Sequence, residues 1–381
     1  MSGDLAESLR AARVAADVSL AALARRTHFS KAALGHIETG RRAVRPEHVV
    51  AYAQALGVPV AALYGPPTDP LRRAHEWLVS SPVTEHARAG RYVGDSLVAT
   101  LERRVVELRR LDDELGGRDL YPLVRNELSD AEALAREASY ADATGRRLLA
   151  VVGQLSQLAG WVASDAGRHT EAEHVYLSGV HAADAAGDRT LGAQLLSTLS
   201  YQLANVGDPR DAALLAQTAV AGAEDAPPIA RALLLERVAW ASARAGERGA
   251  AARALDAVDD AYADRGGDAE PDWVYWLDRR EIDVMAGRVF IATGEPERAE
   301  PLITSALDGY GGSARERGLY LAWLADGYAR AGNLDAARTT LVKARKAADG
   351  VGSTRLDRVL ADVAPGSSAQ PRSGRPASGG Y

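Results

Sequence analysis

A glycine recurs five times in the middle of the chain, and each time an alanine follows five residues later. The pairs are Gly167/Ala172, Gly207/Ala212, Gly246/Ala251, Gly294/Ala299 and Gly332/Ala337, with glycine intervals of 40, 39, 48 and 38 residues. Seven residues before each glycine stands another small residue: Gly160, Ser200, Ala239, Gly287 and Ala325. Glycine readily ends a helix, and small residues let two helices approach closely. The spacing therefore predicts a stack of helical hairpins.

The remaining sequence is also typical of helices. Ala, Leu, Arg and Glu dominate, apolar residues recur at three- and four-residue spacing, and no segment alternates cleanly enough for a strand. Prolines that follow a polar residue predict helix starts at Pro46, Pro209 and Pro296. We therefore expect an all-α protein. Its 381 residues exceed one ordinary core, so several domains or a repeat array are needed.

Composition divides the chain into four segments. The pair Pro66-Pro67 closes a head domain, residues 1–66, and a helical connector or degenerate repeats follow over 67–145. The repeat array occupies 146–362. Residues 363–381 read "VAPGSSAQPRSGRPASGGY", which has too little apolar surface to fold and predicts a disordered tail.

The array resembles the tetratricopeptide repeat, which has a period of about 34 residues and the same ladder of small residues. The longer intervals here predict longer helices or loops, most of all between Gly246 and Gly294. Stacked hairpins of this kind form a concave surface that suits an extended ligand.

Charge is unevenly distributed along the chain, which has a net charge of −6. Residues 1–66 hold eight Lys/Arg and five Asp/Glu, a balance of +3, and the remainder holds 37 against 46, a balance of −9. This asymmetry indicates that only the head domain meets a polyanion.

The head domain contains five short amphipathic segments, near residues 4–17, 20–27, 31–39, 46–56 and 59–64. Ser19 and Ser30 are expected to cap the second and third helices. The shared core is expected to contain Leu9, Leu23, Leu34 and Ile37.

The head resembles the Cro/phage-repressor-like (XRE) helix-turn-helix regulators in three respects. These are the order of the helices, the ending "GVPVAALYG", and the spacing of the key residues Leu20, Ala24, His28, Leu34 and Ile37. The resemblance implies a structural ion pair between Arg13 and Glu38. Two positions depart from the family. His28 replaces the usual turn glycine, so a left-handed histidine is expected there. Leu20 replaces a frequent glutamine, which removes one hydrogen bond on the phosphate side.

The same resemblance makes the helix from Lys31 to Thr39 the recognition helix. Lys31, Ala32 and His36 then face base edges, where lysine can donate to guanine and alanine can contact a thymine methyl group. Ser30, Arg41, Arg42 and Arg45 are expected to contact phosphates, which gives affinity rather than sequence preference. Without the helix-turn-helix motif, Arg41, Arg42 and Arg45 would be interpreted as exposed residues of a solvated loop.

Other chemistries have no clear sequence support. In "HTEAEH", His169 and His174 lie five residues apart, whereas a helical zinc motif needs four, so polar surface is favoured over a metal site. No Walker loop, Gly-x-Ser-x-Gly elbow or acid–base pair is present, so we expect no enzyme and no cofactor. The absence of cysteine excludes disulfides and thiolate sites. No apolar stretch resembles a signal core or spans a bilayer, so a cytoplasmic protein without a membrane partner is expected.

The segment "DWVYWLDRREIDVMAGRVF" supports two hypotheses. Its tryptophans either pack in the core or form a ligand-facing wall, with Arg279 and Arg280 supplying charge for a carboxylate or phosphate. Tyr320 leaves the same choice open. The candidate effector groove consists of tryptophans expected on the first helices of successive hairpins: Trp240, Trp273, Trp276 and Trp323.

A helix-turn-helix head followed by this array resembles actinobacterial one-component transcription regulators and, more distantly, peptide-pheromone-responsive regulators. The resemblance implies a homodimer that binds double-stranded DNA and takes a peptide, small-molecule or protein effector in the groove. The alternative is a repeat adaptor that binds a protein partner without operator-specific DNA binding.

Overall fold

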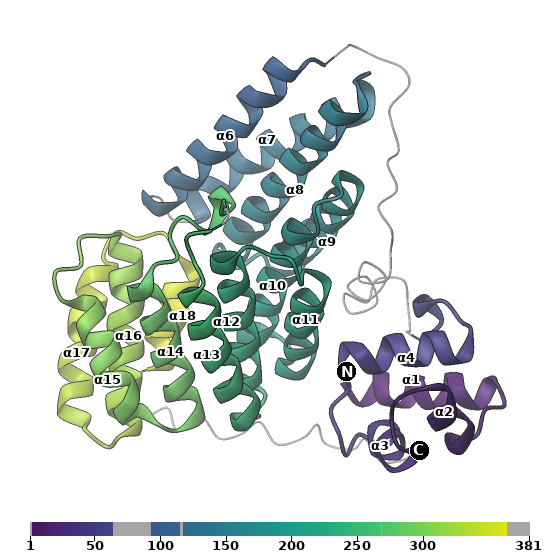
Figure 1. Cartoon of the computed structure of the whole chain (residues 1–381). Helices are drawn as coiled ribbons and strands as arrows, with labels where there is room; N and C mark the ends of the chain where they lie inside the picture. The colour runs from purple at the N-terminus through teal and green to yellow at the C-terminus, as the bar shows by residue number, and fades with distance from the viewer. Residues whose placement is uncertain (1, 64–92, 115–116, 268, 364–381) are drawn as a thin grey trace, which may run out of the picture.

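The structure is a computed structural model that describes residues 2–63, 93–114, 117–267 and 269–363. Within these ranges every element is helical and no strand occurs. A small helical head is followed by an array in which consecutive helices pack on one another (Figure 1). The predicted all-α fold is confirmed. The Pro66-Pro67 boundary and residues 364–381 of the predicted tail lie outside the described residues.

The head contains the five helices expected from the sequence, the last of them a single 3-10 turn. They are α1 (Ser2–Ala15), α2 (Leu20–Arg26), α3 (Lys31–Glu38), α4 (Pro46–Leu56) and η1 (Val60–Leu63). The expected core residues Leu9, Leu23, Leu34 and Ile37 are fully buried, as is Tyr52 of α4. Burial of these side chains holds the short helices together, since helices of this length are not stable alone.

Two serines fix the turns on either side of α2. The Ser19 and Ser30 hydroxyl oxygens accept hydrogen bonds from the backbone N–H groups of Ala22 and Ala33 at 3.1 and 3.2 Å, so both predicted caps are confirmed. The expectation of a left-handed backbone at His28 is wrong. Among the described residues other than glycine, only Asp17 has a positive φ, because the chain leaves α2 in an extended conformation at Thr27.

The array is built of five hairpins. Before them lie α6 (Asp95–Glu114) and α7 (Gly117–Glu137), which pack on α8. The hairpins are α8 (Asp142–Asp165) with α9 (His169–Ala186), α10 (Arg189–Val206) with α11 (Pro209–Gly222), α12 (Pro228–Arg244) with α13 (Arg248–Ala263), α14 (Arg279–Thr293) with α15 (Pro296–Leu307), and α16 (Ala314–Arg330) with α17 (Leu334–Ala348). The last described helix is α18 (Thr354–Asp362).

The repeated small residues do what their spacing predicts. Four of the five marker glycines turn their hairpins with φ between 79° and 85°, whereas Gly207 has φ of −121°. A Cβ atom at Gly160 would lie 2.3 Å from the Tyr176 ring, and one at Gly287 would lie 2.8 Å from Ile303. Larger residues at these positions would therefore force the two helices of a hairpin apart.

The two ends of the array meet. Arg315 of α16 pairs with Asp112 of α6 at 3.3 Å. The Ser353 hydroxyl, at the start of α18, donates to Asp165 of α8 at 2.8 Å. The first helices of the hairpins, α6 and α18 therefore surround one cavity, which stays partly open to solvent.

The longest repeat interval contains an insertion. Residues 269–278, here called the strap, connect α13 to α14 and include η2 (Asp272–Val274). The strap reaches α6, where the Tyr275 hydroxyl donates to Asp113 at 2.5 Å and Arg109 lies 3.5 Å from Asp272. The expectation that Trp273 and Trp276 lie on the first helix of a hairpin is therefore wrong, because both belong to the strap.

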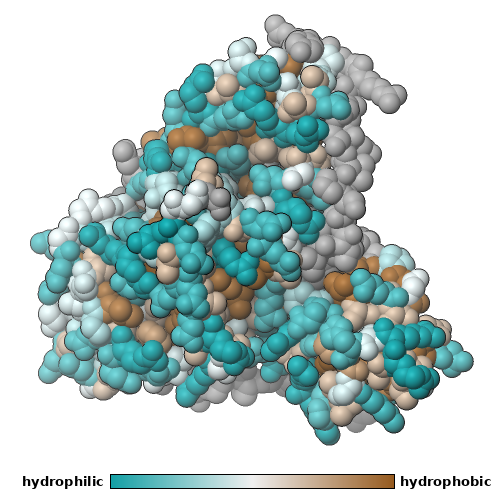
Figure 2. Space-filling model, viewed as in Figure 1, coloured by the Kyte–Doolittle hydropathy of each residue, from teal (hydrophilic) through white to brown (hydrophobic). Residues whose placement is uncertain are grey.

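Hydrophilic residues cover most of the array face in Figure 2, and apolar residues appear between them in small patches. None of the described helices is long and apolar enough to cross a membrane. The head lies beside α11, which α4 contacts (Figure 1).

Candidate nucleic-acid interface and ligand cavity

The outer face of α3 presents the residues that the sequence predicts for base contact. Lys31, Ala32 and His36 are all exposed, whereas Leu34 and Ile37 on the opposite face are buried. Ser30 is also exposed. Its hydroxyl oxygen already accepts the cap hydrogen bond, so the hydroxyl hydrogen remains able to donate to a phosphate.

The loop after α3 folds back on the end of that helix. Gly40 has φ of 68°, and the Arg42 backbone N–H donates to the His36 carbonyl oxygen at 3.0 Å. Arg41 and Arg42 are exposed, and no carboxylate among the described residues lies within ion-pair distance of either. Their guanidinium groups are therefore available to an external anion, next to the predicted base-contacting face.

Arg45 is held more firmly than the other two arginines of this loop. Its backbone N–H donates to the Nδ1 atom of buried His48 at 2.9 Å, and its side chain lies 3.9 Å from the exposed Glu47 carboxylate. Burial lowers the pKa of His48 from 6.5 to about 4, so the ring is neutral at neutral pH and can accept this bond. His48 was not identified from the sequence, because one buried histidine has no periodic signature.

Arg13 and Glu38 lie together, as the family resemblance implies. Two guanidinium nitrogens donate to the two carboxylate oxygens at 2.6 and 2.7 Å. Arg13 also donates to the Val18 carbonyl oxygen at 2.8 Å, and the Tyr52 hydroxyl donates to Glu38 at 3.0 Å. The pair joins α1 to the end of α3 and faces away from solvent, so its role is to orient α3.

A second candidate site is the interior of the array. It is a cavity of about 120 Å³ whose walls come from α6, the strap, α18 and the first helices of all five hairpins. Residues spaced by four and three positions face it, for example Gln194, Thr198 and Tyr201 on α10. The corresponding residues of α14 are Glu281, Met285 and Arg288.

Most of the charges in this cavity are paired. Each of four arginines lies within 4 Å of a carboxylate: Arg109 with Asp272, Arg237 with Glu236, Arg315 with Asp112, and Arg355 with Asp165. Three of the acids that line the cavity accept a hydrogen bond from a tyrosine: Asp113 from Tyr275, Glu281 from Tyr320, and Glu316 from Tyr310. Burial raises the pKa of Glu281 to about 7.

Arg288 differs from these arginines. It is as buried as Arg109, Arg237 and Arg315, at 6% exposed, but no carboxylate among the described residues lies within ion-pair distance of it. Its guanidinium carbon lies 3.9 Å from the centre of the Trp323 ring, 4.2 Å from Trp240 and 5.4 Å from Tyr201. Burial alone would raise the pKa of Tyr201, but Arg288, Arg355 and Arg237 together lower it to about 8. The region around Arg288 is therefore electropositive.

The cavity contains three of the four tryptophans predicted for an effector groove. Trp273, Trp276 and Trp323 line it, while Trp240 lies behind Arg288 and is 8% exposed. The candidate charges were misplaced. Arg279 pairs with Asp259 and Asp283 on the exterior, Arg280 is exposed, and neither lines the cavity.

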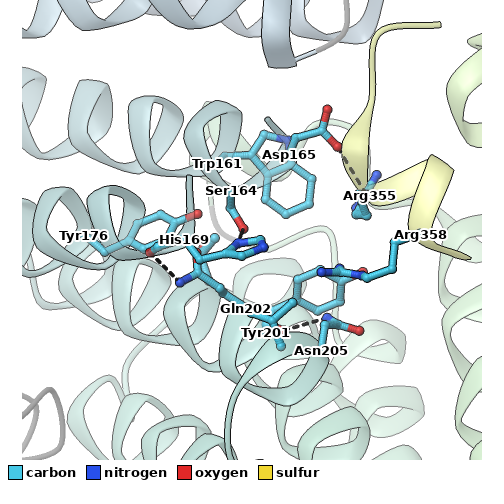
Figure 3. Close-up of a pocket in the computed structure, with 12 residues that line it drawn as sticks. Trp161, Ser164, Asp165, His169, Tyr176, Tyr201, Gln202, Asn205, Arg355 and Arg358 are labelled. Atoms are coloured by element: carbon cyan, nitrogen blue, oxygen red, sulfur yellow. Dashed lines mark hydrogen bonds and ion pairs between the residues drawn. The ribbon is translucent and has the colours of Figure 1, made fainter. Parts of the chain in front are cut away.

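A smaller recess adjoins the cavity through Trp161, Tyr201 and Arg355 (Figure 3). His169 lies in its wall, with its Nδ1 atom 3.5 Å from the Ser164 hydroxyl, and its carbonyl oxygen accepts a hydrogen bond from Gln202. No cluster of potential metal ligands occurs among the described residues. The recess extends the aromatic wall of the cavity.

The sequence contained a signal that would have located these residues. The position directly after the small residue on each first helix is Trp161, Tyr201, Trp240, Arg288 and Asp326. Three successive aromatic residues and then an arginine occupy one structural position. Trp161, Tyr201 and Arg288 line the cavity, Trp240 lies behind Arg288, and Asp326 pairs with Arg330 outside the cavity. This pattern differs from the small-residue spacing that predicts the hairpins, since it concerns the cavity-facing side of each first helix and not the contact between two helices.

Comparisons with known proteins identify the head. Residues 4–63 match the family model described as a helix-turn-helix domain, so the chain contains such a domain. No match was found among curated proteins. Among solved structures, the chain is similar to the crystal structure of BtubC (BKLC) from P. vanneervenii at 14% identity and a TM-score of 0.38. That similarity covers 74% of this chain and 96% of the other.

Proposed function

We propose that this chain is a sequence-specific DNA-binding transcription regulator of the XRE type. The observation that carries the proposal is the helix-turn-helix match at residues 4–63, in which α3 presents Lys31, Ala32 and His36 beside the free arginines Arg41 and Arg42. No catalytic step is assigned to the chain. The regulator acts by binding.

The recognition helix α3 enters the major groove with its N-terminal residues toward the base edges. Lys31 donates to guanine O6 or N7, Ala32 contacts a thymine methyl group, and His36 donates or accepts. Ser30, Arg41, Arg42 and Arg45 contact phosphates and fix the register of the helix. The buried pair of Arg13 and Glu38 supports this helix from behind.

The array supplies dimerisation and effector sensing. One small head makes too few contacts for strong specific binding, so two heads on a two-fold operator are needed. The array cavity supports an effector site, because it has aromatic walls and contains Arg288, which has no carboxylate within ion-pair distance among the described residues. An effector that prefers one arrangement of the two heads then changes the affinity for the operator.

The test is binding of full-length protein to duplex DNA as a function of salt concentration. Arg42→Ala should weaken binding to all sequences alike and reduce the salt slope by about 1. Lys31→Ala and His36→Ala should each cost about 1–3 kcal/mol on the best operator and little on random DNA. The control is Arg10→Ala, which removes an exposed head arginine on α1, outside the predicted interface.

The alternative, a repeat adaptor whose head binds a protein partner, gives a different result. Duplex binding would then be weak, with no preferred sequence. A strong, sequence-dependent affinity with a steep salt slope would exclude the adaptor.

A further inference from the structure

We infer that the array cavity is a binding site for a small aromatic monocarboxylate, whose carboxylate group is held by Arg288. This inference rests on the proposed effector role of the array and specifies its ligand class. It begins from a buried cation, Arg288, that has no carboxylate within ion-pair distance among the described residues.

Arg288 is oriented for one kind of partner. Trp240 and Trp323 both contact its guanidinium group, with ring centres 4.2 and 3.9 Å from the central carbon. Such contacts stabilise the cation and restrict its orientation. The N–H donors lie at the edge of the guanidinium plane, where a carboxylate can accept two parallel hydrogen bonds.

The environment of Arg288 indicates a ligand site more than a structural contact. Every other arginine in the cavity wall has a carboxylate of this chain within 4 Å, and the arrangement leaves only Arg288 without one among the described residues. A charge buried without a partner is strongly unfavourable, so proteins rarely retain one unless a ligand completes the pair. The lowered pKa of Tyr201 reports the same excess of positive charge.

The acids in the cavity direct the carboxylate toward Arg288. Tyrosine hydroxyls donate to Asp113 and Glu316, so these wall positions present carboxyl groups that would repel an anion. Burial raises the pKa of Glu281 to about 7, so this third acid is only partly ionised at neutral pH. Arg315 and Arg355 are neutralised by Asp112 and Asp165. Arg288 is thus the one wall position, among the described residues, that offers an unpaired cation to a monoanion.

The remaining walls select an aromatic body of limited size. Trp161, Tyr201, Trp276, Tyr320 and Trp323 line the cavity, and aromatic rings favour offset or edge contacts with another ring. The volume is about 120 Å³. One water molecule needs about 10–15 Å³ of such space, so roughly ten heavy atoms fit.

Two connections across the cavity argue against an extended peptide. The strap crosses from α13 to α6 through Tyr275 and Asp272, and the contact between Arg315 and Asp112 closes the other side. A peptide lying along the first helices would have to displace both connections. A compact ligand with a single ring can bind while both connections stay intact.

The experiment is isothermal titration calorimetry of full-length protein with phenylacetate and with its neutral isostere phenylacetamide, extended to benzoate and cinnamate at millimolar concentrations. At least one carboxylate should bind with one site per chain and bind better than its amide. Arg288→Met should weaken that carboxylate about 10- to 100-fold, because charge-assisted hydrogen bonds are lost. Arg288→Lys should restore only part of the affinity, since lysine keeps the charge but not the paired donors.

The matched control is Arg298→Met. Arg298 also lies over an aromatic ring, Phe290, at 3.8 Å, but it is on α15, outside the cavity. This variant should bind like the parent, and thermal melting of each variant shows whether the array is folded. The inference is overturned if no carboxylate in the series binds, if acid and amide bind equally, or if Arg288→Met binds as well as the parent. Stronger binding of phenylalanine than of phenylacetate would assign the site to zwitterions instead and also overturn it.

The calorimetry contains no DNA, so it separates the two proposals. Duplex binding without carboxylate binding would leave the regulator intact and remove this ligand class. Carboxylate binding without duplex binding would leave the cavity intact and remove the regulator.

Discussion

The head and the array use arginine in opposite environments. Arg41 and Arg42 of the head are exposed and lie in a loop without carboxylate partners among the described residues. Arg288 of the array is buried between two indole rings. A hydrated, mobile cation suits phosphates whose positions vary, and its contribution is sensitive to salt. A desolvated, fixed cation suits one anion in one orientation, and salt screens it much less.

The comparison also separates function from stability. The exposed arginines of the head can be lost without disturbing its core, because their side chains support no buried group. In the array, the aromatic rings that orient Arg288 belong to the hydrophobic clusters that hold successive hairpins together. Binding and folding should therefore be separable in the head and coupled in the array.

The largest expected effect on stability comes from removing the indole ring of Trp240, which lies behind Arg288. Trp240→Ala should lower the free energy of unfolding of the array by about 3–5 kcal/mol, because a buried indole leaves a cavity. Trp323→Ala should cost clearly less, since this half-buried ring faces the ligand cavity. Denaturant unfolding followed by circular dichroism measures both. Equal losses would mean that Trp323 is a core residue and that the aromatic wall has no separate role.

In the head, the sharpest effect should come from the buried ion pair and not from the surface arginines. Arg13→Ala leaves the Glu38 carboxylate buried with only the Tyr52 hydroxyl as donor, so the head should lose about 2–4 kcal/mol. The array should unfold as before. Hydrogen exchange resolves the two regions, and a uniform change across both would show that they are one cooperative unit.

The two regions should respond to pH in opposite directions. His48 has a folded pKa of about 4 and an unfolded value of 6.5, so the unfolded head binds the proton first. Head stability should fall as pH decreases from 6.5 to 4, by about 3 kcal/mol. Burial raises the pKa of Glu281 from 4.5 to about 7, so array stability should fall as pH rises through that range.

Unfolding at a series of pH values, again with hydrogen exchange to separate the regions, measures these slopes. His48→Gln should flatten the head slope while keeping an acceptor for the Arg45 backbone N–H. Glu281→Gln should flatten the array slope. Slopes that persist in these variants would assign the pH dependence to other groups.

The smallest expected effect is on head stability when the exposed arginines are removed. Arg41→Ala and Arg42→Ala should change the free energy of unfolding by less than about 0.5 kcal/mol, because neither side chain has a buried partner. Their melting temperatures should match that of the parent protein. A large shift would mean that these arginines hold the fold, and the comparison with Arg288 would fail.

Local patterns in the sequence predicted the head and the hairpins well. Caps such as Ser19 and Ser30 act within one turn, and the spacing of Gly160, Gly167 and Ala172 reports contacts inside one hairpin. The cavity could not be predicted in this way. It depends on residues brought together from distant elements, such as Arg315 with Asp112, and on a strap whose course no local pattern specifies. The composition of the strap therefore predicts an aromatic site, but not that Trp273 and Trp276 lie outside the first helix of a hairpin.

The closure of the array has a consequence for how it folds and evolves. In an open solenoid each repeat contacts only its neighbours, so repeats can fray from an end or be added and removed. Here residues 203 positions apart in the chain, Asp112 and Arg315, must meet. Such non-local contacts form late and slow the folding reaction. Duplication or deletion of one hairpin would separate the two ends, so the number of repeats is fixed, and new ligand preferences can arise only by substitution within the ring.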